Sequence, residues 1–322
     1  MPRAIHFVST SDMTNPPERI LIIKLGALGD IILAMDAFHA IRTRHPEAHI
    51  SLLTRAPFVS LTKQMPWFDE VICDTSPKLL QFSKWLSLRA TLRGKKLTRV
   101  YDLQGNDRSA LYFKLIGPNR PEWCGFVKGC SHLRHDHRKD PVPATERMLR
   151  FLESVDVPRA GAADLSWLSG SVDALGLPET FIMLVPGCSP QHPHKRWPAK
   201  HFADLVHLLA IKNIAAVAVG TKVDQDAIEE IRLLAPSLLS LAGKTDIGQV
   251  AEVARRALGV VGNDTGPIHI AAIAGAPTLV LMSGKSDPIK MIPRGSDVGF
   301  LQKDLLADLP ATEVLAAIRL RS

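Results

Sequence analysis

Polar residues at a glycine-containing turn form the first candidate for chemistry. Asp264, Thr265 and Gly266 make up this turn. The short apolar run 258–261 precedes it as a strand pattern, and the helical pattern Ile268–Ile273 follows it. A helix that begins there presents free backbone N–H groups and the positive end of its dipole. We expect Asp264 or Thr265 to cap this helix, and the turn to bind an anion, most simply a phosphate.

A second polar turn lies near the N-terminus, in Lys24-Leu25-Gly26-Ala27-Leu28-Gly29-Asp30. It joins the strand pattern Arg19–Lys24 to the helical pattern Ile31–Arg44, as in the first βα unit of a doubly wound sheet. Its glycines lack the spacing of the dinucleotide fingerprint, and no ribose-binding acid follows the next strand, which argues against an NAD enzyme. Asp30 is either a helix cap or a catalytic carboxylate.

A third turn follows the strand pattern Phe181–Val185 and contains Ser189 and Lys195. A lysine supplies a point charge and a hydroxyl supplies a donor, and a diphosphate needs both. We therefore predict that Ser189 and Lys195 bind the phosphates of a diphosphate ligand. Trp197-Pro198 comes directly afterwards, and we expect it to serve packing, with the proline opening the next helix.

Alternating strands and helices must position these turns. The predicted strands are His49–Thr54, Glu70–Cys73, Arg99–Asp102 and Trp123–Phe126 in the front half, and Ile214–Val219 and Thr278–Met282 in the back half; the predicted helices are Pro57–Gln64, Lys78–Arg93, Ser109–Ile116, Thr145–Val155, Ala199–Ile211 and Leu309–Arg319. Such alternation is typical of α/β domains with parallel sheets.

A segment rich in Pro, Gly, Ala and Ser, 156–178, separates the two runs of elements. Within it only Leu165–Leu168 has a strand pattern. We place the domain joint here and predict two Rossmann-like, doubly wound domains, 1–160 and 161–322.

Composition and charge narrow the class of protein. The 322 residues are 46% hydrophobic and carry a net charge of +7, without an apolar run of transmembrane length or a signal peptide. Four scattered cysteines predict neither a zinc site nor a disulfide framework, so we expect a cytoplasmic protein. No nucleic-acid-binding motif is present.

The positive charge is concentrated in the front half, where residues 1–150 hold 23 Lys and Arg against 14 Asp and Glu. We infer that this half meets an anionic lipid or a phosphorylated sugar rather than nucleic acid. The pattern Lys78–Arg93 is either a basic helix on an anionic membrane or a helix packed on a sheet, and we favour packing for its apolar face. Its charges could still hold the protein near an anionic membrane. The basic loop 128–139 is either an anion-binding loop or plain surface.

Taken together, these turns resemble the ADP-heptose:lipopolysaccharide heptosyltransferases of glycosyltransferase family 9. The resemblance runs from residue 19 to about residue 290 and rests on Asn263-Asp264-Thr265-Gly266 with His269, on the Gly29-Asp30 loop, and on Lys195-Arg196-Trp197-Pro198. It implies a GT-B fold, in which an N-terminal acceptor domain and a C-terminal donor domain face each other across a cleft. By the same analogy the C-terminal helix packs back on the N-terminal domain.

The resemblance also implies a reaction: inverting transfer of heptose from ADP-heptose to a lipopolysaccharide inner-core acceptor. Asp30 would be the general base. Lys195, Ser189 and the backbone at Thr265 and Gly266 would stabilise the leaving ADP, without a metal or a cofactor. His269 either faces the phosphates or is structural. Asp264 either holds sugar hydroxyls or caps the helix.

Further binding residues follow from the same comparison. Asp224, an acid just after the second strand of the back half, would bind the ribose hydroxyls, with Asp226 or a helix-capping role for Asp224 as alternatives. Lys244 belongs to a turn that would lie against the adenine. The predicted acceptor-binding residues are Arg55, Arg108 and Arg134. Two alternatives remain: the same fold with another nucleotide-sugar donor or a protein acceptor, and a non-catalytic nucleotide-binding relative.

Overall fold

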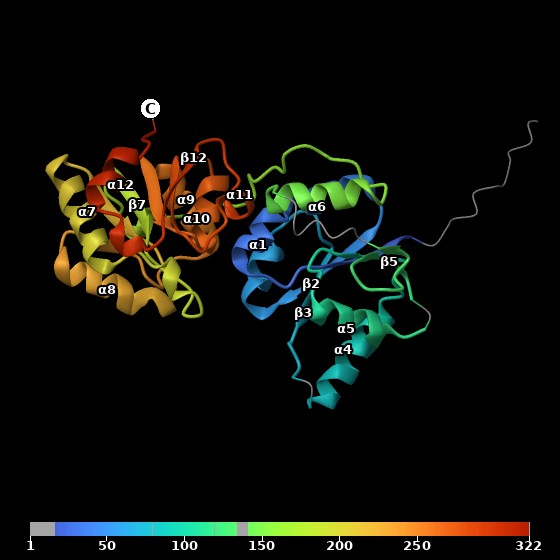
Figure 1. Cartoon of the computed structure of the whole chain (residues 1–322). Helices are drawn as coiled ribbons and strands as arrows, with labels where there is room; N and C mark the ends of the chain where they lie inside the picture. Colours follow the sequence, from blue (N-terminus) through green and yellow to red (C-terminus); the bar gives the residue numbers. More distant parts are fainter. Residues whose placement is uncertain (1–16, 79, 119, 134–140, 322) are drawn as a thin grey trace, which may run out of the picture.

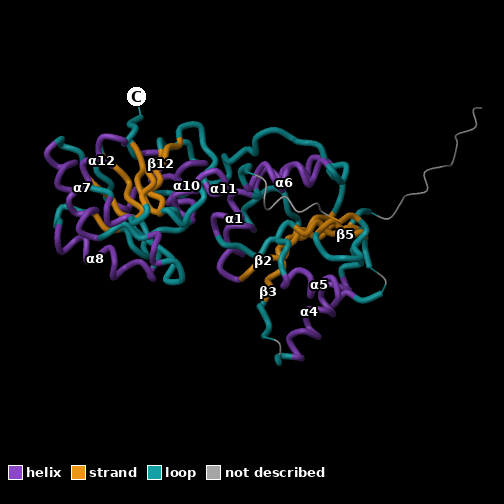
Figure 2. Tube along the Cα trace, in the orientation of Figure 1, coloured by secondary structure: helices purple, strands orange, loops and turns teal. Residues whose placement is uncertain are grey.

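The computed structural model describes residues 17–321 apart from 79, 119 and 134–140. The described part contains two six-stranded parallel sheets, which lie in separate halves of the molecule (Figure 1, Figure 2). The first sheet has the order β3-β2-β1-β4-β5-β6, and the second has the order β12-β11-β10-β7-β8-β9. Both are doubly wound, so the architecture predicted from the alternation of strands and helices is confirmed.

The strands of the first sheet are β1 (Arg19–Ile23), β2 (His49–Arg55), β3 (Glu70–Asp74), β4 (Arg99–Asp102), β5 (Glu122–Gly125) and β6 (His132–Leu133). Those of the second are β7 (Phe181–Val185), β8 (Ala215–Ala218), β9 (Leu239–Ser240), β10 (Gly259–Asn263), β11 (Thr278–Ser283) and β12 (Val298–Lys303). The central strands are buried along nearly their whole length because helices cover both faces of a parallel sheet.

The helices of the first half are α1 (Leu28–Leu33), α2 (Met35–Arg44), α3 (Val59–Thr62), α4 (Phe82–Gly94), α5 (Asp107–Ile116) and α6 (Ala144–Glu153). Those of the second are α7 (Ala199–Ile211), α8 (Gln225–Leu234), α9 (Ile247–Arg256), α10 (Gly266–Ile273), α11 (Pro288–Met291) and α12 (Ala311–Ala317). Among the described residues, no helix combines the length and the apolar character that a membrane span requires.

Each sheet has one topological switch point, where successive crossovers run in opposite directions. In the first sheet, β1 lies between β2 and β4, and the switch falls between β1 and β4. In the second sheet, β7 lies between β8 and β10, and the switch falls between β7 and β10. Ligands of open α/β sheets bind beyond the carboxyl ends of the strands at such points.

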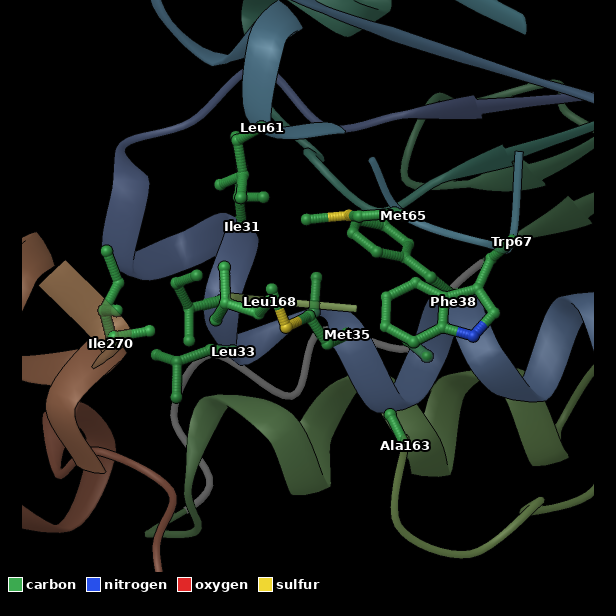
Figure 3. Packing of buried hydrophobic residues seen from close by; sticks show 14 of the residues in the cluster. Ile31, Leu33, Met35, Phe38, Leu61, Met65, Trp67, Ala163, Leu168 and Ile270 are labelled. Carbon is green, nitrogen blue, oxygen red and sulfur yellow. The ribbon is translucent and has the colours of Figure 1, made fainter. Parts of the chain in front are cut away.

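The two halves share part of their hydrophobic core. One contiguous cluster of buried side chains includes Ile31 and Leu33 of α1 together with Ile270 of α10, which Figure 3 shows next to each other. An ion pair adds to this contact, since Arg294 Nη1 lies 2.8 Å from Asp36 Oδ1. The halves therefore meet through α1, α2 and α10.

Several predicted elements need correction. The single helix expected over 31–44 is interrupted at Ala34, where the backbone N–H donates to Ile31 at i−3 rather than at i−4. The helix expected from Lys78 begins only at Phe82, because Gln81 folds back and accepts the Lys78 N–H through its side chain. Leu165–Leu168 is not a strand.

The resemblance implied that the C-terminal helix packs on the N-terminal domain. The structure instead places this helix on the second half. It is α12, and its Val314 is buried in the cluster that covers the second sheet together with Phe202 and Leu209 of α7. Its apolar face is therefore used within its own half.

Candidate active site

Two pockets adjoin the switch points, and one side chain lines both. The larger has a volume of about 450 Å³ and lies between the halves; the turns after β1, β7, β8 and β10 and Met291 of α11 line it. The smaller, of about 130 Å³, lies at the switch point of the first sheet. Asp30 lines both of them. Three separate turns that the sequence singled out thus meet in one place.

Asp30 occupies the third position of α1. Its Oδ2 accepts a hydrogen bond from the backbone N–H of Ala27 at 2.9 Å, and a carboxylate in the first turn also interacts favourably with the helix dipole. The side chain is half-buried and remains in contact with both pockets. The two roles considered for Asp30, a local bond at the helix start and a position at the cleft, are compatible with each other.

Lys195 and Asp264 form an ion pair inside the larger pocket. Lys195 Nζ lies 2.6 Å from Asp264 Oδ2, and the same oxygen accepts a hydrogen bond from Ser286 Oγ at 3.3 Å. Asp264 is buried and makes no cap for α10. Thr265 occupies the N-cap position, but without a capping side-chain bond. The expectation that Asp264 caps the helix is wrong, because its carboxylate is engaged by Lys195.

Asn263 fixes the turns that carry this pair. Its Oδ1 accepts a hydrogen bond from the Trp197 N–H at 3.1 Å, and its Nδ2 donates to the Pro186 carbonyl at 2.8 Å. Trp197 is almost fully buried and its indole N–H donates to the Leu309 carbonyl, so it serves packing, as predicted. The amide of Asn263 therefore holds the turn after β7 against the end of β10.

His269 lies on the first turns of α10 and lines the larger pocket. Burial lowers the pKa of His269 to about 4, although the carboxylates of Asp264 and Asp30 act in the opposite direction. The imidazole is consequently neutral at pH 7. Its Nε2 lies 3.9 Å from Asp264 Oδ1, and its Nδ1 has no hydrogen-bond partner among the described residues.

The end of the larger pocket next to β8 combines an acid with apolar walls. Asp224 Oδ2 accepts hydrogen bonds from the Thr221 N–H at 2.9 Å and the Thr221 hydroxyl at 2.7 Å. Its carboxylate lies over Gly187, where a Cβ would come within 2.6 Å of Oδ1. Val219 and Val223 line the same wall. Ser189 also lines this pocket, so the structure brings most of the predicted donor residues together.

Lys244 is an exception among the predicted donor residues. It follows β9, and its Nζ donates a hydrogen bond to the Ser240 carbonyl at 3.3 Å. It lines a separate hollow on the surface and not the larger pocket. The structure therefore does not bring Lys244 together with the other predicted donor residues.

The three arginines predicted to bind an acceptor are not brought together. Arg55 is exposed at the end of β2. Neither Arg55 nor Arg108 is among the described residues that line the two pockets. The guanidinium of Arg108 stacks 4.8 Å from the Trp85 ring centroid and donates to the Pro77 carbonyl at 2.9 Å. Arg134 lies outside the described residues.

The smaller pocket contains two cations that the sequence analysis missed. Lys24 and Arg147 line it together with Asp30 and Gln104. Lys24 directly follows β1 at the switch point, and the rule for carboxyl ends of strands would have marked it. Arg147 lies on α6, and nothing in its local pattern distinguishes it from a surface residue.

Metal-binding groups are not evident in the described part of the chain. Asp224 and Asp226 are two residues apart, yet Asp226 is exposed on α8 and Asp224 is bonded to Thr221. No group of three or more His, Cys, Asp or Glu side chains in the described ranges could hold a metal ion.

The chain is similar to known proteins over most of its length. The sequence profile of glycosyltransferase family 9 (heptosyltransferase) matches residues 85–306. Lipopolysaccharide heptosyltransferase 2 of Salmonella typhimurium is 29% identical over 297 residues, which is 84% of each chain. The structure of E. coli ADP-heptose lps heptosyltransferase II has a TM-score of 0.74 at 23% identity and covers 92% of this chain and 96% of its own. E. coli heptosyltransferase WaaC with ADP has a TM-score of 0.72 at 20% identity and covers 92% and 98%. These likenesses confirm the predicted GT-B fold.

Proposed function

The chain belongs to glycosyltransferase family 9, the heptosyltransferases, and from this premise we propose that it transfers heptose from ADP-heptose to a lipopolysaccharide inner-core sugar with inversion at the anomeric carbon. The relatives support the substrates: the E. coli and Salmonella proteins are heptosyltransferases by name, and the WaaC structure contains ADP. The observation that carries the proposal is the position of Asp30 between two pockets.

The larger pocket suits the nucleotide sugar. The diphosphate would lie where Lys195, the Ser189 hydroxyl and the N-terminus of α10 converge. These groups favour the negative charge that develops on the departing ADP. Asp224 is positioned to bind ribose hydroxyls, and the valines beside it offer an apolar surface to the base. No bound metal is part of this proposal.

The smaller pocket suits the acceptor. It adjoins Asp30 and contains the cationic side chains of Lys24 and Arg147, so a carboxylate or phosphate on the acceptor sugar could bind there. An acceptor hydroxyl would then lie between Asp30 and the anomeric carbon of the donor. A base that contacts both pockets can remove the hydroxyl proton as the oxygen attacks.

Inversion follows from a single displacement. The acceptor oxygen forms a bond to the anomeric carbon, the bond from that carbon to the phosphate oxygen breaks, Asp30 takes the proton, and ADP leaves with the electron pair. An oxocarbenium-like transition state connects these changes, as it does when inverting glycosidases use water. A single displacement needs only one carboxylate, that of Asp30, as its general base.

A transfer assay tests the proposal. The enzyme is incubated with ADP-heptose and lipopolysaccharide that lacks the relevant heptose; released ADP and the mass of the acceptor are measured, and the product linkage is determined by NMR. We expect ADP release that depends on acceptor, addition of one heptose and inverted configuration. Turnover only with UDP- or GDP-sugars would reject the donor, and retention of configuration would reject the single displacement.

A further inference from the structure

A stretch of the first half combines positive charge with a lack of carboxylates. Residues 75–98 contain no Asp or Glu but six Lys and Arg: Lys78, Lys84, Arg89, Arg93, Lys95 and Lys96. Lys95 is paired with Glu70, and Arg89 is half-buried. The side chains of Lys78, Lys84, Arg93 and Lys96 are exposed. This stretch includes the whole of α4.

The same stretch exposes large apolar side chains. Leu80 is 84% exposed, Phe82 is 69% exposed and Leu86 is 62% exposed. Phe82 and Leu86 are four residues apart and lie on one face of the helix. Only Leu88 and Leu92 of α4 are buried against the first half. Packing therefore accounts for the second half of the helix and for Trp85, which lies against the same cluster, and it leaves Phe82 and Leu86 exposed.

The first turns of α4 are held in a defined shape. The indole N–H of Trp85 donates to the Lys78 carbonyl at 3.0 Å, and Arg108 stacks on the Trp85 ring while it donates to the Pro77 carbonyl. Arg108, which was expected to bind the acceptor, thus supports this turn. Figure 1 shows α4 at the far end of the first half, away from the second sheet. Leu80, Phe82 and Leu86 with Lys78 and Arg93, which lies two helical turns after Leu86 on the same face, form what we call the α4 surface.

We propose that the α4 surface binds the surface of an anionic lipid membrane. Apolar side chains of an interfacial helix enter the boundary between headgroups and acyl chains, and the cations beside them attract anionic headgroups. The charge pattern favours lipid over a protein partner, because residues 75–98 expose four cations and contain no carboxylate, which matches a uniformly negative surface. Leu233 on α8 differs: it is 74% exposed, but Glu229 and Glu230 are on the same helix. The proposal extends beyond the proposed reaction and does not depend on it.

Vesicle sedimentation tests the proposal without any substrate. The full chain is mixed with vesicles of phosphatidylethanolamine and phosphatidylglycerol, or with vesicles of phosphatidylcholine alone. We expect binding to the anionic vesicles, weaker binding at high salt, and little binding to phosphatidylcholine. Phe82→Ser with Leu86→Ser should weaken binding by about tenfold or more, and Lys78→Gln and Arg93→Gln by about fivefold each.

Matched controls keep the result decisive. Leu233→Ser removes an equally exposed apolar side chain on the other half and should leave vesicle binding unchanged. Circular dichroism and thermal unfolding verify that each variant is folded. Equal binding to both kinds of vesicle, or equal binding by the α4 variants and the wild type, would overturn the proposal. So would a change of oligomeric state, without loss of lipid binding, when Phe82 and Leu86 are replaced, because the surface would then join copies of the chain.

Discussion

The imidazole of His269 lies directly against Gly29, so that a Cβ on Gly29 would stand 3.1 Å from His269 Cδ2. A reciprocal contact accompanies it, because a Cβ on Gly266 would lie 2.7 Å from Leu28 Cδ2. Helices α1 and α10 therefore approach each other closely, with a glycine on each side. This approach brings Asp30 beside the Lys195–Asp264 pair and assembles the larger pocket from both halves.

Replacement of Gly266 tests this contact. In Gly266→Ala the new methyl group must displace Leu28, and overpacking of this kind destabilises a protein by about 1–3 kcal/mol. Thermal unfolding should show a lower midpoint. Gly94→Ala is the control, because a Cβ at Gly94 meets nothing within 4 Å and alanine favours a helix. A Gly266→Ala variant as stable as Gly94→Ala would contradict the close approach.

The catalytic role of Asp30 predicts that its replacement lowers the rate of transfer without lowering the affinity for the donor nucleotide. In Asp30→Ala, kcat for heptose transfer should fall by about 10²–10⁴-fold, the usual contribution of a general base. The affinity for ADP, measured by calorimetry, should stay close to that of the wild type because Asp30 is expected to contact the acceptor. Asp107→Ala removes another first-turn carboxylate, that of α5, and should leave kcat unchanged. Loss of ADP binding in Asp30→Ala would reject its assignment as base.

Lys195 should govern the affinity for the donor. Lys195→Met removes the charge that would contact the diphosphate, and a hydrogen bond to a charged group contributes about 1.5–3 kcal/mol, so Kd for ADP should rise about tenfold or more. The variant also leaves Asp264 buried without its cation and should be less stable. Adding Asp264→Asn should restore stability but not affinity. Lys200→Met, at an exposed ion pair with Asp204, serves as the control. Unchanged ADP affinity in Lys195→Met would remove this residue from the phosphate site.

His269 should make the protein sensitive to acid. The pKa of His269 in the folded protein, about 4, lies below the ordinary histidine pKa of about 6.5, so the unfolded chain binds the proton more readily between these values. The contribution of neutral His269 to the free energy of unfolding is therefore fully present above pH 6.5 and is lost as the pH falls toward 4. This loss is on the order of 3 kcal/mol in all. The free energy of unfolding of His269→Gln should decline less steeply in this range. His207→Gln, at an exposed histidine, should retain the wild-type slope, and a wild-type slope in His269→Gln would show that His269 is not buried in its neutral form.

Local sequence patterns account well for the strands. Phe181–Val185 is predicted to the residue because a parallel strand buried on both faces is a short apolar run between polar turns. The interruption at Ala34 has no such signal, since neither glycine nor proline stands there. Long-range contacts decide that feature, as they decide where α12 packs.

The site is predictable in its parts and not in its pairings. The sequence marks Asp30, Lys195 and Asp264 as members of polar turns that follow strands. It does not show that Lys195 and Asp264, which are 69 positions apart, form an ion pair. Lys24 and Arg147 meet only after β1 and α6 are in place. Arg108 shows the opposite error: its motif suggested a ligand contact, whereas its guanidinium supports the turn before α4.

The most direct test of the central claim is a calorimetric titration of the purified protein, without added metal, against ADP, UDP, GDP and NAD. We predict selective binding of ADP, weakened in Lys195→Met and retained in Asp30→Ala. Preference for UDP or GDP would contradict the proposed donor while leaving the fold intact. Binding of NAD alone, or of none of the four, would contradict the assignment of the pocket between the halves to an ADP-sugar.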